Sequence, residues 1–156
     1  MSMLAAIRPD DWNLPLLLHV LGAMLLVGGL TAAVTALWAG WRADSLTLPR
    51  LGFRSLLFVA FPAWWLMRIP GQWIASKEGF DGGSEEPAWL GIGYITAEAG
   101  GLLMLISILL TGLGVRRMRK SDPPRASLMV RIGTVFVTIV LAAYVIAVWA
   151  MTTKPD

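Results

Sequence analysis

Residues 14–41 read LPLLLHVLGAMLLVGGLTAAVTALWAGW, an apolar run in which His19 is the one ionisable side chain. An α-helix needs about 20 mostly apolar residues to cross the ~30 Å hydrocarbon layer of a bilayer. The run exceeds this length, so it predicts a transmembrane helix that tilts or projects from the membrane. It also exceeds the ~7–15 apolar residues of a cleaved signal peptide, and Asp10 and Asp11 precede it, so we expect it to be retained.

Three further apolar runs follow, at residues 51–74, 89–114 and 128–151. In the whole chain of 156 residues, 56% are hydrophobic and 15% are charged, against about 25% charged in an average soluble domain. A soluble fold of this length could not bury so much apolar surface, whereas a bilayer requires no polar covering. The sequence therefore predicts an all-α protein, an antiparallel four-helix transmembrane bundle that forms a single domain over residues 1–156.

The basic residues between the runs predict the orientation. Loops one and three are basic and short, and the loop between the second and third runs is acidic; the basic residues are Arg42, Arg50, Arg54, Arg116, Arg117, Arg119, Lys120 and Arg125, and the acidic ones Glu78, Asp81, Glu85 and Glu86. Basic loops stay in the cytoplasm. We therefore expect a multi-pass protein of the bacterial cytoplasmic membrane with both termini outside (N-out/C-out), and no nucleic-acid partner despite the net charge of +3.

Small residues predict close helix packing. They recur at every fourth position in the first span (Gly28, Ala32, Ala36, Gly40) and in the third (Gly93, Ala97, Gly101). Such rows let helix backbones approach closely in lipid. We expect them to pack within the bundle, with a homodimer face as the alternative. Pro62 in the second span removes a backbone donor and predicts a kink, and Pro70 and Gly71 loosen the same helix near its outer end.

Each span also carries a polar side chain at a similar depth. At a rise of about 1.5 Å per residue, His19, Arg68, Glu98 and Tyr144 lie roughly 8–13 Å from the outer ends of their spans. Gln72 follows Arg68, and Tyr94 precedes Glu98, by one helical turn. We predict a polar cluster of these six residues inside the bundle, with Trp64 and Trp65 holding the Arg68 guanidinium by cation–π contact.

Two interpretations of this cluster remain open. An Arg68–Glu98 pair could be purely structural, because either charge alone would be costly in lipid. The cluster could equally hold a ligand, a cofactor or a proton. His19 could ligate haem or copper, with Met24, Met67 or Met104 as a second ligand, and Glu98 could serve a proton-coupled carrier. The chain has no cysteine, and no Ser-His-Asp set is evident, so enzymatic activity is uncertain and not favoured.

Residues 18–30, LHVLGAMLLVGGL, resemble the first-helix pattern of bacterial CopD-type copper-resistance membrane proteins and HemJ-type protoporphyrinogen oxidases. The pattern is also similar to four-helix integral membrane families without an assigned activity, which the stretch PAWWLMRIPGQWIASKE at residues 62–78 resembles more. The resemblance implies that His19 is a haem or metal ligand. No second intramembrane histidine accompanies it, so we expect a membrane protein that acts through a membrane-protein partner or a homodimer.

Overall fold

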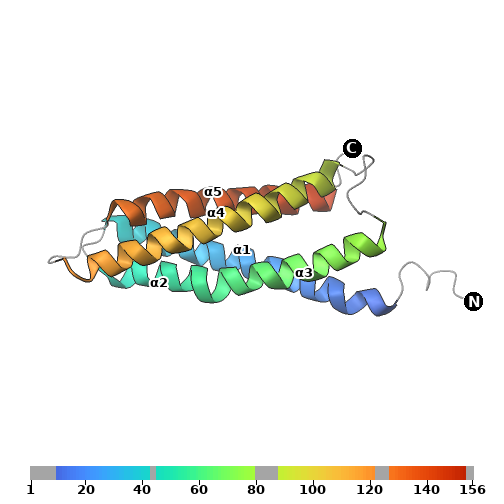
Figure 1. Ribbon diagram of the computed structural model, residues 1–156, viewed down its shortest axis with the longest axis horizontal. Coiled ribbons are helices and arrows are strands. Elements are labelled where there is room, and N and C mark those ends of the chain that lie inside the picture. Colours follow the sequence, from blue (N-terminus) through green and yellow to red (C-terminus); the bar gives the residue numbers. More distant parts are fainter. Residues whose placement is uncertain (1–9, 43–44, 80–87, 122–126, 154–156) are drawn as a thin grey trace, which may run out of the picture.

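The computed structural model describes residues 10–42, 45–79, 88–121 and 127–153, and all regular structure in these ranges is helical (Figure 1). A short 3-10 turn, η2 (Asp10–Trp12), leads into α1 (Asn13–Arg42). The chain continues through α2 (Thr47–Ser55), the π-helical segment η3 (Leu56–Ala60), α3 (Phe61–Lys77), α4 (Ala88–Met118) and α5 (Leu128–Thr153). Three helices, α1, α4 and α5, are long and apolar enough to cross a membrane.

The second predicted span, residues 51–74, falls on the three consecutive segments α2, η3 and α3 instead of on one regular helix. Pro62 accounts for the interruption, because it has no N–H to offer the carbonyl four residues earlier. Just before it, the N–H of Phe61 bonds to the carbonyl of Leu56, five residues back, which is the widened π pattern. The predicted irregularity at Pro62 is therefore a π-helical segment that precedes the proline.

Glycine faces bring α1 against the α2–η3–α3 segment. A β-carbon added to Gly22 would lie 2.8 Å from Cα of Met67, and one on Gly29 would lie 3.0 Å from the backbone nitrogen of Ala60. Gly40, near the end of α1, meets Pro49, near the start of α2, in the same way. As residue numbers rise along α1, the numbers of the residues that it contacts in the α2–η3–α3 segment therefore fall, from Met67 to Pro49.

The helices α4 and α5 pack with the same order of contacts. Gly114 meets Val130, Gly100 meets the ring of Tyr144, and Gly93 meets the end of Met151. The small buried residues of α4 recur at every seventh position, as Gly93, Gly100, Ser107 and Gly114, and those of α1 do so as Gly22, Gly29 and Ala36. Seven residues are close to two turns, so such residues share one face of the helix.

The predicted four-residue rows behave differently in the two helices. In α4, Gly93, Ala97 and Gly101 are all buried. In α1, Ala36 and Gly40 are buried, but Gly28 and Ala32 lie on the outer surface, and a β-carbon on Gly28 would meet nothing within 4 Å. Four-residue steps advance about 40° each around a helix, so Gly28 and Gly40 differ by about 120°.

Aromatic rings fill the space between α2–η3–α3 and α4. A β-carbon on Gly101 would lie 2.5 Å from Cζ2 of Trp64, and one on Gly112 would lie 2.8 Å from Cε2 of Phe53. The indole N–H of Trp64 donates to the carbonyl of Ala97 at 3.0 Å, which fixes the ring against α4. The glycine faces therefore build two close helix pairs, α1 with the α2–η3–α3 segment and α4 with α5, and the two rings separate the α2–η3–α3 segment from α4.

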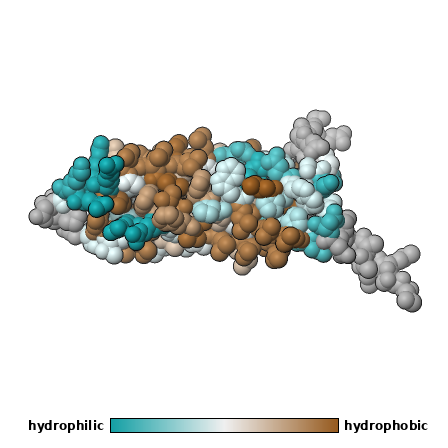
Figure 2. All heavy atoms as spheres, turned by 60° about the horizontal axis from the view of Figure 1, so that its bottom comes forward, coloured by the Kyte–Doolittle hydropathy of each residue, from teal (hydrophilic) through white to brown (hydrophobic). Residues whose placement is uncertain are grey.

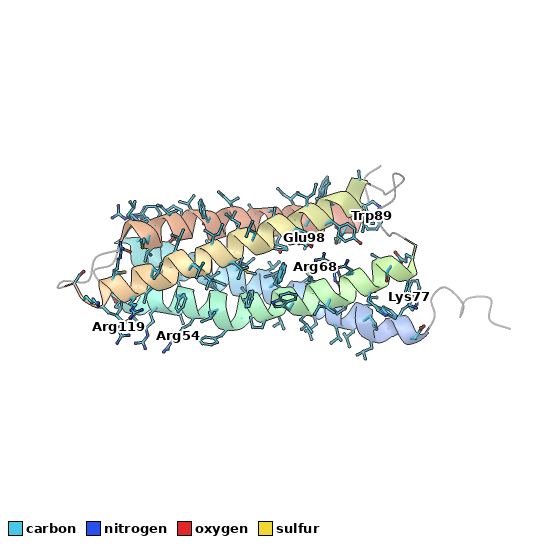
Figure 3. The ribbon with its side chains drawn as sticks, viewed as in Figure 1. Arg54, Arg68, Lys77, Trp89, Glu98 and Arg119 are labelled. Atoms are coloured by element: carbon cyan, nitrogen blue, oxygen red, sulfur yellow. The ribbon has the colours of Figure 1, made fainter. Side chains whose placement is uncertain are left out.

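The two ends of the molecule differ in charge. We name them the Trp89 end and the Arg119 end after residues labelled in Figure 3. Basic residues gather at the Arg119 end, namely Arg42, Arg50, Arg54, Arg116, Arg117, Arg119, Lys120 and Arg131. Within the described ranges, the acidic residues Asp10, Asp11, Glu78 and Glu98 all lie in the half toward the Trp89 end; the predicted loop acids Asp81, Glu85 and Glu86, and Arg125, fall outside those ranges.

Figure 2 shows a brown apolar band across the middle of one face, with teal polar atoms at the left, the Arg119 end. Large exposed side chains such as Leu109, Ile139 and Ile146 belong to the long apolar helices. An exposed apolar surface of this kind suits lipid, because lipid requires no polar covering. The all-helical fold with three long apolar helices is thus compatible with a membrane protein.

Candidate functional site

A cavity of about 210 Å³ lies toward the Trp89 end, and α1, α3, α4 and α5 all contribute to its wall. Most of the wall is apolar, from residues such as Leu26, Leu90 and Ala147. The polar side chains on it include five of the six that the sequence predicts to cluster: His19, Arg68, Gln72, Tyr94 and Tyr144. The sixth, Glu98, is not among the lining residues but pairs with Arg68 beside the cavity.

The Arg68–Glu98 pair connects α3 to α4. Figure 3 shows the two labelled side chains reaching toward one another from these helices. Arg68 donates from Nε to Oε1 of Glu98 at 3.0 Å, and its Nη2 also contacts this oxygen. Its Nη1 donates to Oε1 of Gln72 at 2.6 Å. Arg68 is 16% exposed and Glu98 64%, so the pair lies with its cation inward and its carboxylate outward.

The guanidinium of Arg68 also covers an aromatic ring, but not a predicted one. Its Cζ lies 5.7 Å from the centre of the Tyr94 ring. The prediction that Trp64 and Trp65 hold this cation is wrong: Trp64 is turned to the Ala97 carbonyl of α4, and Trp65 is exposed. Trp64 and Trp65 lie about one helical turn from Arg68 on α3, but the guanidinium lies over the ring of Tyr94 on α4 instead.

His19 occupies a slot in α3 that Gly71 creates. Its Nδ1 lies 2.8 Å from the backbone carbonyl of Met67. A β-carbon on Gly71 would lie 2.6 Å from the same nitrogen, so only glycine leaves room for the imidazole. A carbonyl can only accept, so Nδ1 carries the proton, and a neutral ring keeps its lone pair on Nε2.

Tyr144 reaches the cavity from α5. The side chain is 4% exposed, and its ring lies against Gly100, where a β-carbon would come within 3.2 Å of Cε2. Among the described residues, its buried hydroxyl makes no hydrogen bond of normal geometry, although the indole of Trp64 lies beside it. A buried polar group without a partner costs about 1–3 kcal/mol, so a native structure with one calls for a partner such as a ligand or an ordered water.

Several residues of the site are absent from the predicted cluster. Gly71 leaves the space that His19 occupies, and Trp64 lies between α3 and α4 next to the cavity. Met151 contacts Gly93, and both residues line the cavity. Gly71 was a visible signal, because it removes a side chain from the face of α3 that meets α1. Nothing in the spacing of Met151 distinguishes it from other packing residues.

The predicted cofactors fit the cavity unequally. Its volume is below the ~300–1,000 Å³ of pockets that enclose drug-sized ligands, so a whole haem does not fit inside. The donors for copper fit better: Met67 and Met151 line the same cavity as His19. Met24 is exposed, and Met104, although buried, is not part of the wall. Within the described ranges, no three His, Asp or Glu side chains gather into a metal-binding group.

No family model, curated protein or solved structure matches the chain.

Proposed function

We propose that this protein is an integral membrane protein of the bacterial cytoplasmic membrane, an antiparallel four-helix transmembrane bundle that binds a small ligand in the cavity at its outer, Trp89 end. The observation that carries the binding function is the buried hydroxyl of Tyr144, which lacks a hydrogen-bond partner among the described residues and lies on the wall of a mostly apolar cavity. Ligand pockets are mostly apolar, with a few polar groups that orient the ligand.

Contacts along α1 support the fourth crossing. The α2–η3–α3 segment accompanies α1 from Pro49, beside Gly40, to Met67, beside Gly22. A segment that follows a membrane-spanning helix over this length would cross the bilayer with it. The falling residue numbers along α1, and the same order between α4 and α5, support antiparallel neighbours.

The charge difference between the two ends supports both termini lying outside, because basic residues favour the cytoplasmic side. The chain has no cysteine, so single cysteines can report on each end. Lys77→Cys, at the Trp89 end, should react with a membrane-impermeant maleimide in intact cells. The matched variant Lys120→Cys, at the other end, should react only after permeabilisation. The reverse pattern would overturn the orientation, and equal labelling of both would overturn the number of crossings.

Ligand binding can be tested on the full chain after extraction from its membrane in mild detergent. Native mass spectrometry should detect a bound small molecule, and Tyr144→Phe should retain less of it. Thr35→Val is the control, because it removes a hydroxyl that bonds within α1 and does not line the cavity. If wild type retains nothing and takes up nothing from a total extract of its membrane, the proposed function is wrong.

A second candidate is a Cu(I) site, favoured by the position of His19. Its Nδ1–H is fixed on the Met67 carbonyl, and metal-ligating histidines are commonly held in this way. The remaining Nε2 would join the thioethers of Met67 and Met151, soft ligands that suit Cu(I). Wild type titrated with Cu(I) under reducing conditions should then retain the metal, and Met67→Leu and Met151→Leu should not, whereas Met24→Leu should. Failure of wild type to retain copper would remove this candidate.

A further inference from the structure

Among the described residues that line the cavity, Arg68 is the one Lys or Arg, and its guanidinium is already engaged. The guanidinium nitrogens Nε and Nη2 of Arg68 are directed to Glu98, Nη1 is bonded to Gln72, and one face covers the Tyr94 ring. Glu78 also lines the cavity and adds a negative charge near its opening. An anion would therefore find Arg68 already neutralised and would have to lose its own solvation in an apolar space, which is costly.

Two polar groups on the wall have unused hydrogen-bonding capacity, and they are complementary. Nε2 of His19 is an acceptor, because Nδ1 holds the proton against the Met67 carbonyl. The Tyr144 hydroxyl is a donor without a partner among the described residues. A single ligand hydroxyl placed between them would donate its O–H to Nε2 of His19 and accept from Tyr144 with its oxygen.

The size and opening of the cavity indicate what the hydroxyl is attached to. About 210 Å³ of mostly apolar space would hold the polar head and the first carbons of a ligand. Exposed lining residues, among them Gln72 and Val148, show that the cavity reaches the surface of the bundle. Val148 belongs to the apolar helix α5, so a longer apolar chain could continue from the opening into lipid.

From these features we infer that the ligand is an uncharged amphipathic alcohol or phenol, whose hydroxyl lies between His19 and Tyr144 and whose apolar part extends toward the bilayer. This inference rests on the proposed ligand-binding function and names its substrate class. It separates the site from one for a fatty-acid anion, a phospholipid headgroup or a quaternary amine.

The test uses the full-length protein in lipid vesicles and a dodecanol that carries a diazirine at the end of its chain. Photolabelling should saturate, and peptide mapping should place the label on α1, α3, α4 or α5 around the cavity. Unlabelled competitors with the same chain then compare the heads: 1-dodecanol, its methyl ether, dodecanoate and dodecyltrimethylammonium, each corrected for its own partitioning. We expect dodecanol to compete best, by about threefold or more over the ether, as one lost hydrogen bond implies.

Variants assign the two hydrogen bonds. Tyr144→Phe should weaken competition by alcohol and ether alike, whereas Thr35→Val, which removes a hydroxyl bonded within α1 and away from the cavity wall, should change neither. The variant His19→Gln keeps a donor for the Met67 carbonyl. The variant His19→Leu removes the acceptor for the O–H of the ligand, so the preference for alcohol over ether should disappear in this variant. The comparison of heads on wild type needs no variant and therefore stands even if one of these proteins folds poorly.

The outcomes separate this inference from the function on which it rests. If dodecanoate or the quaternary amine competes better than dodecanol, the ligand is charged and the inference is overturned, while ligand binding stands. Equal competition by alcohol and ether on wild type would also overturn it, because His19 would then accept nothing. If no probe labels the cavity saturably, and extracts of the membrane supply no ligand, the proposed function itself fails.

Discussion

A β-carbon on Gly71 would lie 2.6 Å from Nδ1 of His19, so the glycine of α3 and the histidine of α1 occupy complementary space. The same nitrogen is 2.8 Å from the Met67 carbonyl, one turn earlier on α3. The slot therefore fixes the position of His19 and also determines which of its ring nitrogens carries the proton.

We predict that Gly71→Ala displaces the imidazole and destabilises the protein by about 1–3 kcal/mol, the usual cost of overpacking. His19 is the only histidine, so its ring nitrogens can be followed by NMR without ambiguity. The wild-type spectrum should show a proton on Nδ1, and the variant should lose that signature. Gly91→Ala is the control, because a β-carbon there meets nothing within 4 Å. Equal spectra for wild type and Gly71→Ala would contradict the slot.

The Arg68–Glu98 pair predicts an asymmetric response to substitution. Glu98→Leu leaves a mostly buried guanidinium without its anion, whereas the double variant Arg68→Leu/Glu98→Leu removes both charges. Removing one partner of such a pair is usually worse than replacing both with apolar residues. Thermal unfolding in detergent should therefore rank the double variant above Glu98→Leu. A double variant less stable than either single one would show that the two residues act independently.

The predicted proton-coupled carrier is tested by a different substitution at the same residue. Glu98→Gln keeps the shape of the side chain and removes its titration. If the protein couples transport to protons through Glu98, uptake into vesicles should lose its dependence on a pH gradient in this variant. Transport equal to that of wild type would remove the carrier interpretation and leave Glu98 as the structural partner of Arg68.

Ser55 provides a hydrogen bond between segments next to η3. Its hydroxyl donates to the carbonyl of Gly29 at 2.8 Å, across the interface with α1. We predict that Ser55→Ala lowers stability by about 0.6 kcal/mol, the average for such bonds between membrane helices. Thr35→Val is the control, since the Thr35 hydroxyl bonds within its own helix, to Thr31. Indistinguishable melting curves for wild type and Ser55→Ala would show that the bond contributes nothing.

The indole of Trp64 gives a prediction about the spacing of the two helix pairs. A β-carbon on Gly101 would lie 2.5 Å from Cζ2 of that ring, so Gly101→Ala should push α3 and α4 apart or displace the indole from the Ala97 carbonyl. Crosslinking between cysteines placed at Arg68 and Glu98, whose side chains meet between α3 and α4, should become less efficient in the first case. Unchanged crosslinking together with unchanged tryptophan fluorescence would contradict the tight contact.

The sequence allowed much of this fold to be predicted, and the limits have physical causes. Apolar length identified α1, α4 and α5, because a membrane-spanning helix must satisfy its backbone internally over a fixed thickness. The second span was harder to predict, since the π-helical segment before Pro62 shifts the residues that follow it to a different face of the helix. Equal depth was enough to associate His19, Arg68 and Tyr144, which all line one cavity.

Contacts between helices could not be obtained from spacing within one helix. Trp64 and Trp65 follow the right period for Arg68, but the ring that meets it is Tyr94 of α4. The small-residue rows illustrate the same limit: four-residue spacing suggested Gly28 together with Gly40 for the packed face, whereas the packed glycines of α1 are Gly22, Gly29 and Gly40. A homodimer or partner at the outward Gly28 face stays a prediction.

The residues that hold each glycine-packed helix pair together differ from the aromatic residues that lie between the two pairs. Close contacts at the glycines hold each pair together. The rings of Trp64 and Phe53 fill the space between the α2–η3–α3 segment and α4. Smaller side chains in place of Trp64 and Phe53 would bring α3 and α4 closer together and reduce the cavity volume, and the glycine contacts within each pair would stay as they are. The capacity of the cavity is therefore adjustable through a few side chains, so that ligands of different bulk could be accommodated on an unchanged frame.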